Sequence, residues 1–374
     1  MKSAVSNAGI ILALVFIMGL AGCTSRPGPD VLTTVRPLPG NTQVKVFAVT
    51  TRTRMTPDTN AYDNGKSVTS NYAELNVSIP PGHKDSQIEW PKKGKKPNPK
   101  TDFAVTQQAV LDRATFYAQV KAANPASKKV GVYVHGYNSN FQESVYRLAQ
   151  MSADAKLAAT PIAFSWPSQG ELAGYVADKD SATYSRDYLV DLMKELTKDR
   201  AVGDVTIFGH SMGGWLVVEA LRQLKLEGRQ DVLVKLNVIL AAPDIDSDLF
   251  RTQMAVIGKL PRPMIILVSK DDRALEASKI LSYSTARVGR LDVDDPKVQE
   301  AAVEAGIVLI DITQIQSMDS ANHSRFADVA ALYPALTAES AKKKDLGNAG
   351  AFVFDAAAAT ISSPFRIVSG ALKQ

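Results

Sequence analysis

Six short apolar segments recur through the middle of the chain, separated by longer segments of mixed polarity. They cover residues 130–134, 161–166, 205–208, 236–240, 264–268 and 307–310. Continuous apolar runs of this length are typical of strands that are buried on both faces, as in a parallel sheet covered by helices. The segments between them predict helices over residues 141–155, 184–197, 215–226 and 295–305. This alternation predicts an α/β fold with a mostly parallel, doubly wound sheet.

Two earlier segments have a different pattern. Residues 44–49 form an apolar strand candidate, and residues 72–79 alternate between apolar and polar side chains as a half-buried strand does. We expect them to pair as a leading antiparallel hairpin. The chain has no internal repeat and no sign of a second domain, so one domain is predicted over residues 44–334. Residues 335–374 are alanine-rich and polar and predict a peripheral C-terminal tail.

The N-terminus has the pattern of an export and anchoring signal. Lys2 precedes a short apolar run, residues 10–20, which ends in Leu20-Ala21-Gly22-Cys23. A membrane span needs about 20 apolar residues, and this run is shorter. The small residues before Cys23 are typical of a cleavage site. The segment resembles a bacterial lipoprotein signal, which implies removal of residues 1–22 and lipidation of Cys23.

Other features of the sequence agree with a lipid anchor. Cys23 is the only cysteine, so no disulfide can form within the chain. Residues 23–43 then predict a tether, which begins with several proline and glycine residues. Thr24 stands where an aspartate would signal inner-membrane retention, so the resemblance implies an outer-membrane protein that faces the periplasm. The membrane is thus an expected partner through the N-terminal lipid.

Composition narrows the class of protein only slightly. With 45% hydrophobic and 22% charged residues, the chain is an ordinary globular protein, and its formal net charge of +5 does not indicate a nucleic-acid partner. Part of the excess lies in the lysine-rich residues 92–100, which we interpret as a solvated loop. Contact of this loop with anionic lipid headgroups is a secondary interpretation.

A glycine-flanked serine follows the third of the six apolar segments. The motif is Gly209-His210-Ser211-Met212-Gly213, between the predicted strand 205–208 and the predicted helix 215–226. A strand, a sharp turn through a serine and a helix form the nucleophile elbow of α/β-hydrolases. Glycines at 209 and 213 permit the close backbone approach that this turn requires. Ser211 is therefore the predicted nucleophile, and a serine that merely caps the helix is the alternative.

A serine nucleophile needs a base, and the chain has four histidines. His210 adjoins Ser211 and is expected to point away from it, His83 lies far upstream, and His135 ends a predicted strand. His323 follows the last of the apolar segments, where the chain order of this fold requires the base. His323 is therefore the predicted general base.

The acid that orients the base has two possible locations. Asp271 and Asp272 follow the predicted strand 264–268, whereas Asp244 and Asp246 follow the preceding one. The acid of this fold usually follows the later strand, which favours Asp271 or Asp272, with the other one capping the next helix. For the oxyanion hole we predict the backbone N–H groups of Tyr137, in the loop after residues 130–134, and of Met212.

Taken as a set, several strings resemble a bacterial α/β-hydrolase family of uncharacterised function, across about residues 44–330. They are Ser78-Ile79-Pro80-Pro81-Gly82-His83, His135-Gly136-Tyr137-Asn138, Phe164-Ser165-Trp166-Pro167-Ser168, the Ser211 motif, Ala242-Pro243-Asp244-Ile245-Asp246 and Asp272-Arg273-Ala274-Leu275. The resemblance implies the α/β-hydrolase fold, and it selects Asp272 over Asp271 as the acid.

The function expected from these residues is that of a serine hydrolase that cleaves carboxylic esters through an acyl-enzyme. Its catalytic residues would be Ser211, Asp272 and His323, and its partner a small acyl substrate. An amidase or thioesterase with the same triad is an alternative, and so is a non-catalytic envelope lipoprotein that binds ligands. No cofactor or metal is expected, because the sequence has no glycine-rich phosphate loop and no histidines at metal-ligand spacing.

Overall fold

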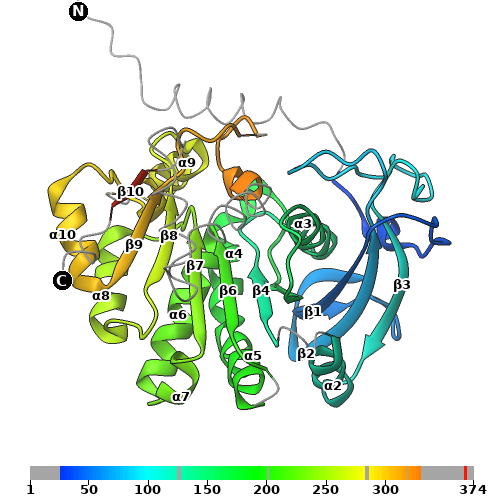
Figure 1. Cartoon of the computed structure of the whole chain (residues 1–374), viewed down its shortest axis with the longest axis horizontal. Coiled ribbons are helices and arrows are strands. Elements are labelled where there is room, and N and C mark those ends of the chain that lie inside the picture. The colour runs from blue at the N-terminus through cyan, green and yellow to red at the C-terminus, as the bar shows by residue number, and fades with distance from the viewer. Residues whose placement is uncertain are drawn as a thin grey trace, which may run out of the picture.

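The computed structural model describes residues 26–123, 128–199, 202–282, 286–317 and 319–329, and the backbone of residues 366–368. Its centre is a single sheet with the strand order β10-β9-β8-β7-β6-β4-β5-β1-β2-β3, which Figure 1 shows with helices on both faces. The strands are β1 (Gln43–Arg54), β2 (Tyr62–Ser78), β3 (Ala104–Leu111), β4 (Val130–Val134), β5 (Thr160–Ser165), β6 (Val205–His210), β7 (Leu236–Ala241), β8 (Met264–Val268), β9 (Ile307–Asp311) and β10 (Arg366–Val368).

In the middle of the sheet, from β9 to β1 in the strand order, neighbouring strands are parallel. The β1–β5, β5–β4, β4–β6, β6–β7, β7–β8 and β8–β9 pairs all run in the same direction. The β1–β2, β2–β3 and β9–β10 pairs are antiparallel. The predicted α/β-hydrolase fold, with a mostly parallel sheet and a leading antiparallel pair, is thereby confirmed.

Helices connect the strands and cover the sheet. They are α2 (Arg113–Ala123), α3 (Phe141–Asp154), α4 (Tyr175–Tyr184), α5 (Arg186–Lys198), α6 (Met212–Leu226), α7 (Gln230–Leu233), α8 (Ser247–Ile257), α9 (Arg273–Leu281) and α10 (Pro296–Ala305), together with the short 3₁₀ helices η1 (Pro29–Leu32), η2 (Leu172–Gly174) and η3 (Val288–Arg290). Among the helices of the described residues, none is both long and apolar enough to cross a membrane.

The hydrophobic core has two layers because the sheet is covered on both faces. Val132 and Val134 of β4 pack with Leu189 of α5 and Leu216 of α6 in one layer. The residue between them, Tyr133, belongs to the other layer, which includes Phe141 and Val145 of α3. Successive side chains of a strand point to opposite faces, so positions on both faces of such a strand are buried. This explains why the central strands are continuous apolar runs in the sequence.

The structure differs from the sequence prediction at the first strands. The expected hairpin exists, but β1 also pairs in parallel with β5, from Phe47 opposite Ile162 onward, and so belongs to the main sheet. β3 and α2 were not predicted. β3 lies at the edge of the sheet and contains Thr106, Gln107 and Gln108, so it lacks the apolar pattern by which a central strand is identified.

Residues 26–43, which the sequence assigned to a tether, lie against the domain. Val31 and Leu32 of η1 and Val35 are buried. The Tyr146 hydroxyl of α3 donates to the Val31 carbonyl at 2.7 Å, and the Val35 N–H donates to Val105 of β3 at 2.9 Å. The tail predicted over residues 335–374 lies outside the described residues except for β10, which pairs with β9. Residues 1–25, including Cys23, also lie outside them.

Candidate active site

Ser211 occupies the sharp turn between β6 and α6. Its backbone has φ 54° and ψ −122°, a strained conformation for a residue other than glycine. Its N–H donates to the Ala241 carbonyl at 2.9 Å, and its carbonyl accepts from Gly214 at 2.9 Å. These backbone bonds hold the turn in place and leave the side chain at the C-terminal edge of the parallel strands.

Two glycines make this turn sterically possible. A Cβ at Gly213 would lie 2.3 Å from the carbonyl oxygens of both Val134 and His135, and one at Gly209 would lie 2.8 Å from the Gly214 Cα. Backbone atoms cannot yield to contacts this short, so any larger residue would push α6 away from β4 and β6. The elbow motif is therefore required by packing, independently of any catalytic role.

The loop after β4 lies directly against the serine. A Cβ at Gly136 would lie 2.9 Å from the Cβ of Ser211, so the close approach again requires glycine. Tyr137 follows in this loop, and Met212 is the first residue of α6. Neither the Tyr137 nor the Met212 backbone N–H donates a hydrogen bond to a described residue. Both groups are thus available to an acceptor near Ser211, as an oxyanion hole requires.

The segment after β5 fixes the β4 loop from one side. The indole of Trp166 stacks on the ring of His135, with centroids 4.9 Å apart, and its Nε1–H donates to the His135 carbonyl at 2.7 Å. Burial is the main reason that the pKa of His135 is lowered to about 3, with the charge of Arg52 adding to the effect. His135 is therefore neutral and structural. The Phe164–Ser168 motif, whose role the sequence did not reveal, is explained by these contacts.

Buried charged groups fix the same loop from two other sides. The Asp178 carboxylate of α4 accepts from the Asn138 N–H at 3.3 Å, from the Gln169 N–H at 2.6 Å and from the Ser168 hydroxyl. Burial raises the pKa of Asp178. The fully buried Arg52 guanidinium of β1 donates to the Ser139 carbonyl at 2.7 Å, and burial lowers its pKa to about 10. Sequence reasoning missed both residues, because each lies far from the loop along the chain.

His323 forms an ion pair with Asp272. Its Nδ1 lies 2.7 Å from Asp272 Oδ2, and the Asp272 side chain is fully buried. The other oxygen, Oδ1, accepts from the Leu275 N–H at 2.9 Å and so caps α9. Burial alone would lower the pKa of His323, but the charge and the hydrogen bond of Asp272 outweigh it and raise that pKa. We expected the two neighbouring aspartates to divide these tasks, whereas Asp272 performs both.

Each of the other candidate acids has a different partner. Asp271 forms an ion pair with Arg325 at 2.6 Å. Asp244 forms a buried ion pair with Arg287 at 3.2 Å, and Asp246 caps α8 through the N–H groups of residues 248 and 249. Of the four aspartates considered, only Asp272 contacts His323 among the described contacts.

His323 lies beside the turn that carries Ser211, and no hydrogen bond joins the two side chains among the described contacts. The ring of His210, the neighbour of Ser211, lies 4.7 Å from the ring of His323 between centroids, and its Nε2 lies 3.4 Å from the His323 carbonyl. In the absence of substrate, hydrogen bonds between a nucleophile and its base are often long or unformed. Burial, and next the charge of His323, lower the pKa of His210, so this ring is a neutral support.

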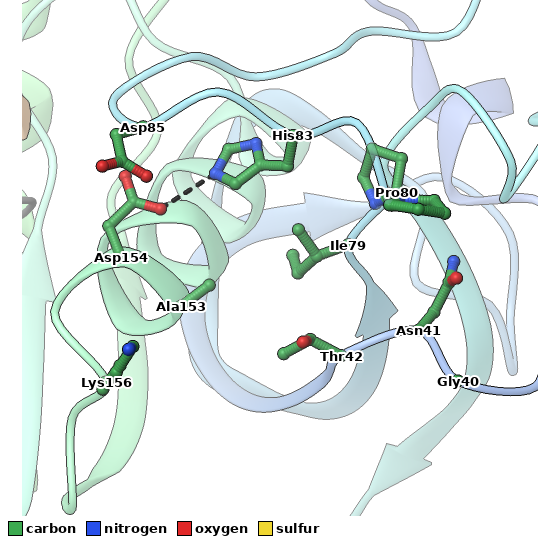
Figure 2. Close-up of a pocket in the computed structure, with 11 residues that line it drawn as sticks. Gly40, Asn41, Thr42, Ile79, Pro80, His83, Asp85, Ala153, Asp154 and Lys156 are labelled. Carbon is green, nitrogen blue, oxygen red and sulfur yellow. Dashed lines mark hydrogen bonds and ion pairs between the residues drawn. The ribbon is translucent and has the colours of Figure 1, made fainter.

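The fourth histidine belongs to a different part of the molecule. His83 lines a cavity of about 520 Å³ with Ile79, Pro80 and Asp154, shown in Figure 2. Its Nδ1 lies 2.7 Å from Glu89 and its Nε2 lies 2.8 Å from Asp154, so both ring nitrogens have partners. Burial alone would lower the pKa of His83, but these two carboxylates raise it to about 9. His83 therefore joins the loop after β2 to the end of α3 as a charged link.

No group of three or more histidine, cysteine or acidic side chains in the described part of the chain is arranged to hold a metal ion. Together, the sheet and the sharp turn at Ser211 are typical of the α/β-hydrolase fold. The chain belongs to the family described as alpha/beta hydrolase of unknown function (DUF900), whose model matches residues 112–340. This agrees with the family resemblance seen in the sequence.

Other comparisons add remote likenesses. A protein described as a hydrolase from Agrobacterium vitis S4 has 15% sequence identity and a TM-score of 0.31, over 64% of this chain and 93% of that chain. One of two fungal esterases from Rhizomucor miehei has 10% identity and a TM-score of 0.31, over 91% of this chain and 94% of that chain. Similarity this remote supports no conclusion about substrate. A comparison with curated proteins found no match.

Proposed function

We propose that the protein is a serine hydrolase that cleaves carboxylic esters. The observation that carries this proposal is the 2.7 Å contact between His323 and the fully buried Asp272, at the edge of the sheet where Ser211 occupies a strained elbow. A buried carboxylate on Nδ1 selects the tautomer in which Nε2 is free to accept a proton. The raised pKa of His323 agrees with a carboxylate that stabilises the imidazolium.

In the first half of the reaction, the Ser211 hydroxyl attacks the acyl carbonyl while His323 Nε2 accepts its proton. The N–H groups of Tyr137 and Met212 donate to the resulting oxyanion. His323 then gives its proton to the leaving alcohol, and the acyl group remains on Ser211. In the second half, His323 activates a water molecule that releases the carboxylic acid and restores the serine.

The direct test is removal of the nucleophile. We expect Ser211→Ala to fold normally and to lower kcat for an activated short-chain ester by several orders of magnitude, and His323→Ala to cause a comparable loss. The double variant should be little worse than either single one, because the two residues act as a unit. Labelling by a fluorophosphonate probe should map to the Ser211 peptide and be absent in Ser211→Ala.

A suitable control is Ser152→Ala, which removes a buried hydroxyl. Among the described residues, this hydroxyl donates to the Leu148 carbonyl of its own helix. This variant should keep its activity and its labelling. Ester hydrolysis that survives Ser211→Ala would rule out the serine mechanism. A parent enzyme that hydrolyses no ester and takes no label would favour a binding protein instead.

We also propose that Cys23 carries a lipid that anchors the enzyme to the outer membrane, facing the periplasm. The support is the Leu20-Ala21-Gly22-Cys23 sequence, in which Cys23 is the only cysteine of the chain. Cys23→Ser should move the protein from the membrane fraction to the soluble fraction. A variant that still fractionates with membranes would contradict the anchor.

A further inference from the structure

The described residues begin at Arg26, beside the loop that carries Tyr137. The Arg26 guanidinium donates to both carboxylate oxygens of Glu143 at 3.0 Å and to the Asn138 side-chain oxygen at 2.6 Å. It also donates to the backbone carbonyls of Asn138 and Gly170. Glu143 lies on α3, Asn138 lies in the Tyr137 loop and Gly170 lies in the segment after β5. Arg26 is therefore fixed at the same edge of the sheet as Ser211.

The next residue strengthens this attachment. The Pro27 carbonyl accepts from the Asn140 side chain at 2.9 Å and from the Gln142 side chain at 2.6 Å. Asn140 caps α3 and follows the Tyr137 loop directly. Arg26 and Pro27 thus cannot move away from the active-site edge without breaking several hydrogen bonds and the ion pair of Arg26 with Glu143.

This attachment limits how far Cys23 can lie from the active site. Cys23 precedes Arg26 by three residues. A fully extended chain spans at most about 3.3–3.6 Å per residue, so the two Cα atoms can be separated by roughly 11 Å at most. A lipid on Cys23 would therefore hold the active-site edge close to the membrane surface, rather than leave the domain on a long tether.

The same edge exposes apolar side chains. Leu172 of η2 is 56% exposed and Val176 of α4 is 75% exposed. Leu172 is linked directly to the Tyr137 loop, because the Tyr137 hydroxyl donates to the Leu172 carbonyl. The ring of Tyr175, between them, packs on the ring of Tyr137 with centroids 5.4 Å apart. We refer to Leu172 and Val176 as the apolar rim.

From the short tether and the apolar rim, we infer that the active-site edge faces the membrane and that the substrates are membrane-resident esters with long acyl chains. This inference rests on the proposed ester hydrolysis and on a lipidated Cys23. Moving an acyl chain from a bilayer into water is unfavourable by about 0.8 kcal/mol for each CH₂ group. An active-site edge held against the bilayer avoids that step, and Leu172 and Val176 supply an apolar contact for the acyl chain.

The test compares a long-chain ester embedded in vesicles with a short-chain, water-soluble ester, using the full-length lipidated protein reconstituted into the same vesicles. One variant carries a flexible insertion of twenty Gly and Ser residues between Thr24 and Ser25, which would extend the reach of the tether to roughly 25 Å. A second variant is Leu172→Ser with Val176→Ser. The matched control is Leu226→Ser, an exposed apolar residue at the C-terminal end of α6, the end opposite Ser211.

We expect both variants to lower kcat/KM for the vesicle ester tenfold or more and to keep kcat/KM for the soluble ester within twofold, and the control to change neither. An unchanged ratio of the two activities in both variants would overturn the inference. A parent that cleaves only the soluble ester, or a Cys23 without lipid, would overturn it as well while leaving the serine hydrolase intact. A parent that cleaves neither ester would instead refute the proposed function.

Discussion

The substitution Asp272→Asn tests the orientation of His323 with little disturbance of the fold. In the parent, Asp272 Oδ1 accepts from the Leu275 N–H at 2.9 Å and Oδ2 contacts His323 Nδ1 at 2.7 Å. The asparagine oxygen can keep the first contact, and asparagine is as good a helix cap as aspartate. We therefore expect the free energy of unfolding to change by about 1 kcal/mol or less.

The effect on catalysis should be much larger. The asparagine NH₂ group would face His323 Nδ1, and two donors cannot share one hydrogen bond. The imidazole is then driven to the tautomer that carries its proton on Nε2, where it cannot accept the proton of Ser211. In a serine protease the same change lowers kcat about 10⁴-fold. A loss of that size corresponds to about 5.4 kcal/mol of transition-state stabilisation, at about 1.36 kcal/mol for each factor of ten.

The pH profile gives an independent measurement. His323 acts as a base only when neutral, so kcat/KM falls as the pH decreases through its pKa. Because Asp272 raises that pKa against the opposing effect of burial, the acid limb of the parent should lie above the ordinary histidine value of about 6.5. In Asp272→Asn the limb should move to lower pH. The asparagine carries no negative charge to stabilise the imidazolium, so the pKa of His323 should fall.

The assay measures kcat/KM for a soluble activated ester as a function of pH on both sides of the acid limb. Urea unfolding of each variant gives the free energy of unfolding. The control is Asp271→Asn, which weakens an ion pair with Arg325 in which the Asp271 side chain is 45% exposed. Exposed pairs contribute about 0–1 kcal/mol, so this variant should lose less than tenfold in kcat/KM. The reverse ranking, or a large loss at Asp244→Asn with Asp272→Asn active, would refute our assignment of the acid.

Three further predictions concern two residues around the site and the half-buried His83. Gly213→Ala should lower the free energy of unfolding by about 1–3 kcal/mol or more in a urea titration, because its Cβ would lie 2.3 Å from two carbonyl oxygens of the β4 segment; a parent-like midpoint would contradict the packing argument. His83→Gln should lower the free energy of unfolding by about 1–3 kcal/mol below pH 6.5, and this deficit should disappear as the pH rises through about 9. The reason is that the raised pKa makes the contribution of His83 depend on its charge. A deficit that does not vary with pH would contradict this. Asp178→Asn should lower kcat about tenfold with little change in KM, because it weakens the bond that holds the Asn138 N–H beside the Tyr137 loop; an unchanged kcat would show that the loop is held adequately without it.

Local sequence patterns were sufficient for the central strands and for the elbow. The apolar runs at residues 130–134 and 264–268 coincide with β4 and β8, because a strand buried on both faces needs apolar side chains at every position. The conformation of Ser211 follows from Gly209 and Gly213, which act within a few residues of the serine. Such features depend on neighbours along the chain, and the amino-acid sequence displays those neighbours directly.

Features that depend on distant residues could not be derived in the same way. Asp271 and Asp272 are adjacent and chemically identical, and from the residues alone both remained candidates for the partner of His323. His323 lies 51 residues after Asp272 in the chain, and their contact exists because α9 and the loop around His323 pack together. In the same way, β3 is a strand because it pairs with β2, although its own sequence is polar.

The sequence by itself thus determined the type of fold and the position of the predicted nucleophile, since both follow from short-range periodicity and steric limits. Only the tertiary structure decided that Asp272 contacts His323, that Arg52 and Asp178 fix the loop beside Ser211, and that Arg26 attaches the start of the domain to the same edge. Each of these contacts joins segments that are far apart in the chain. The direction in which each of these side chains points depends on how helices and strands pack, and that information is not contained in any local pattern of residues.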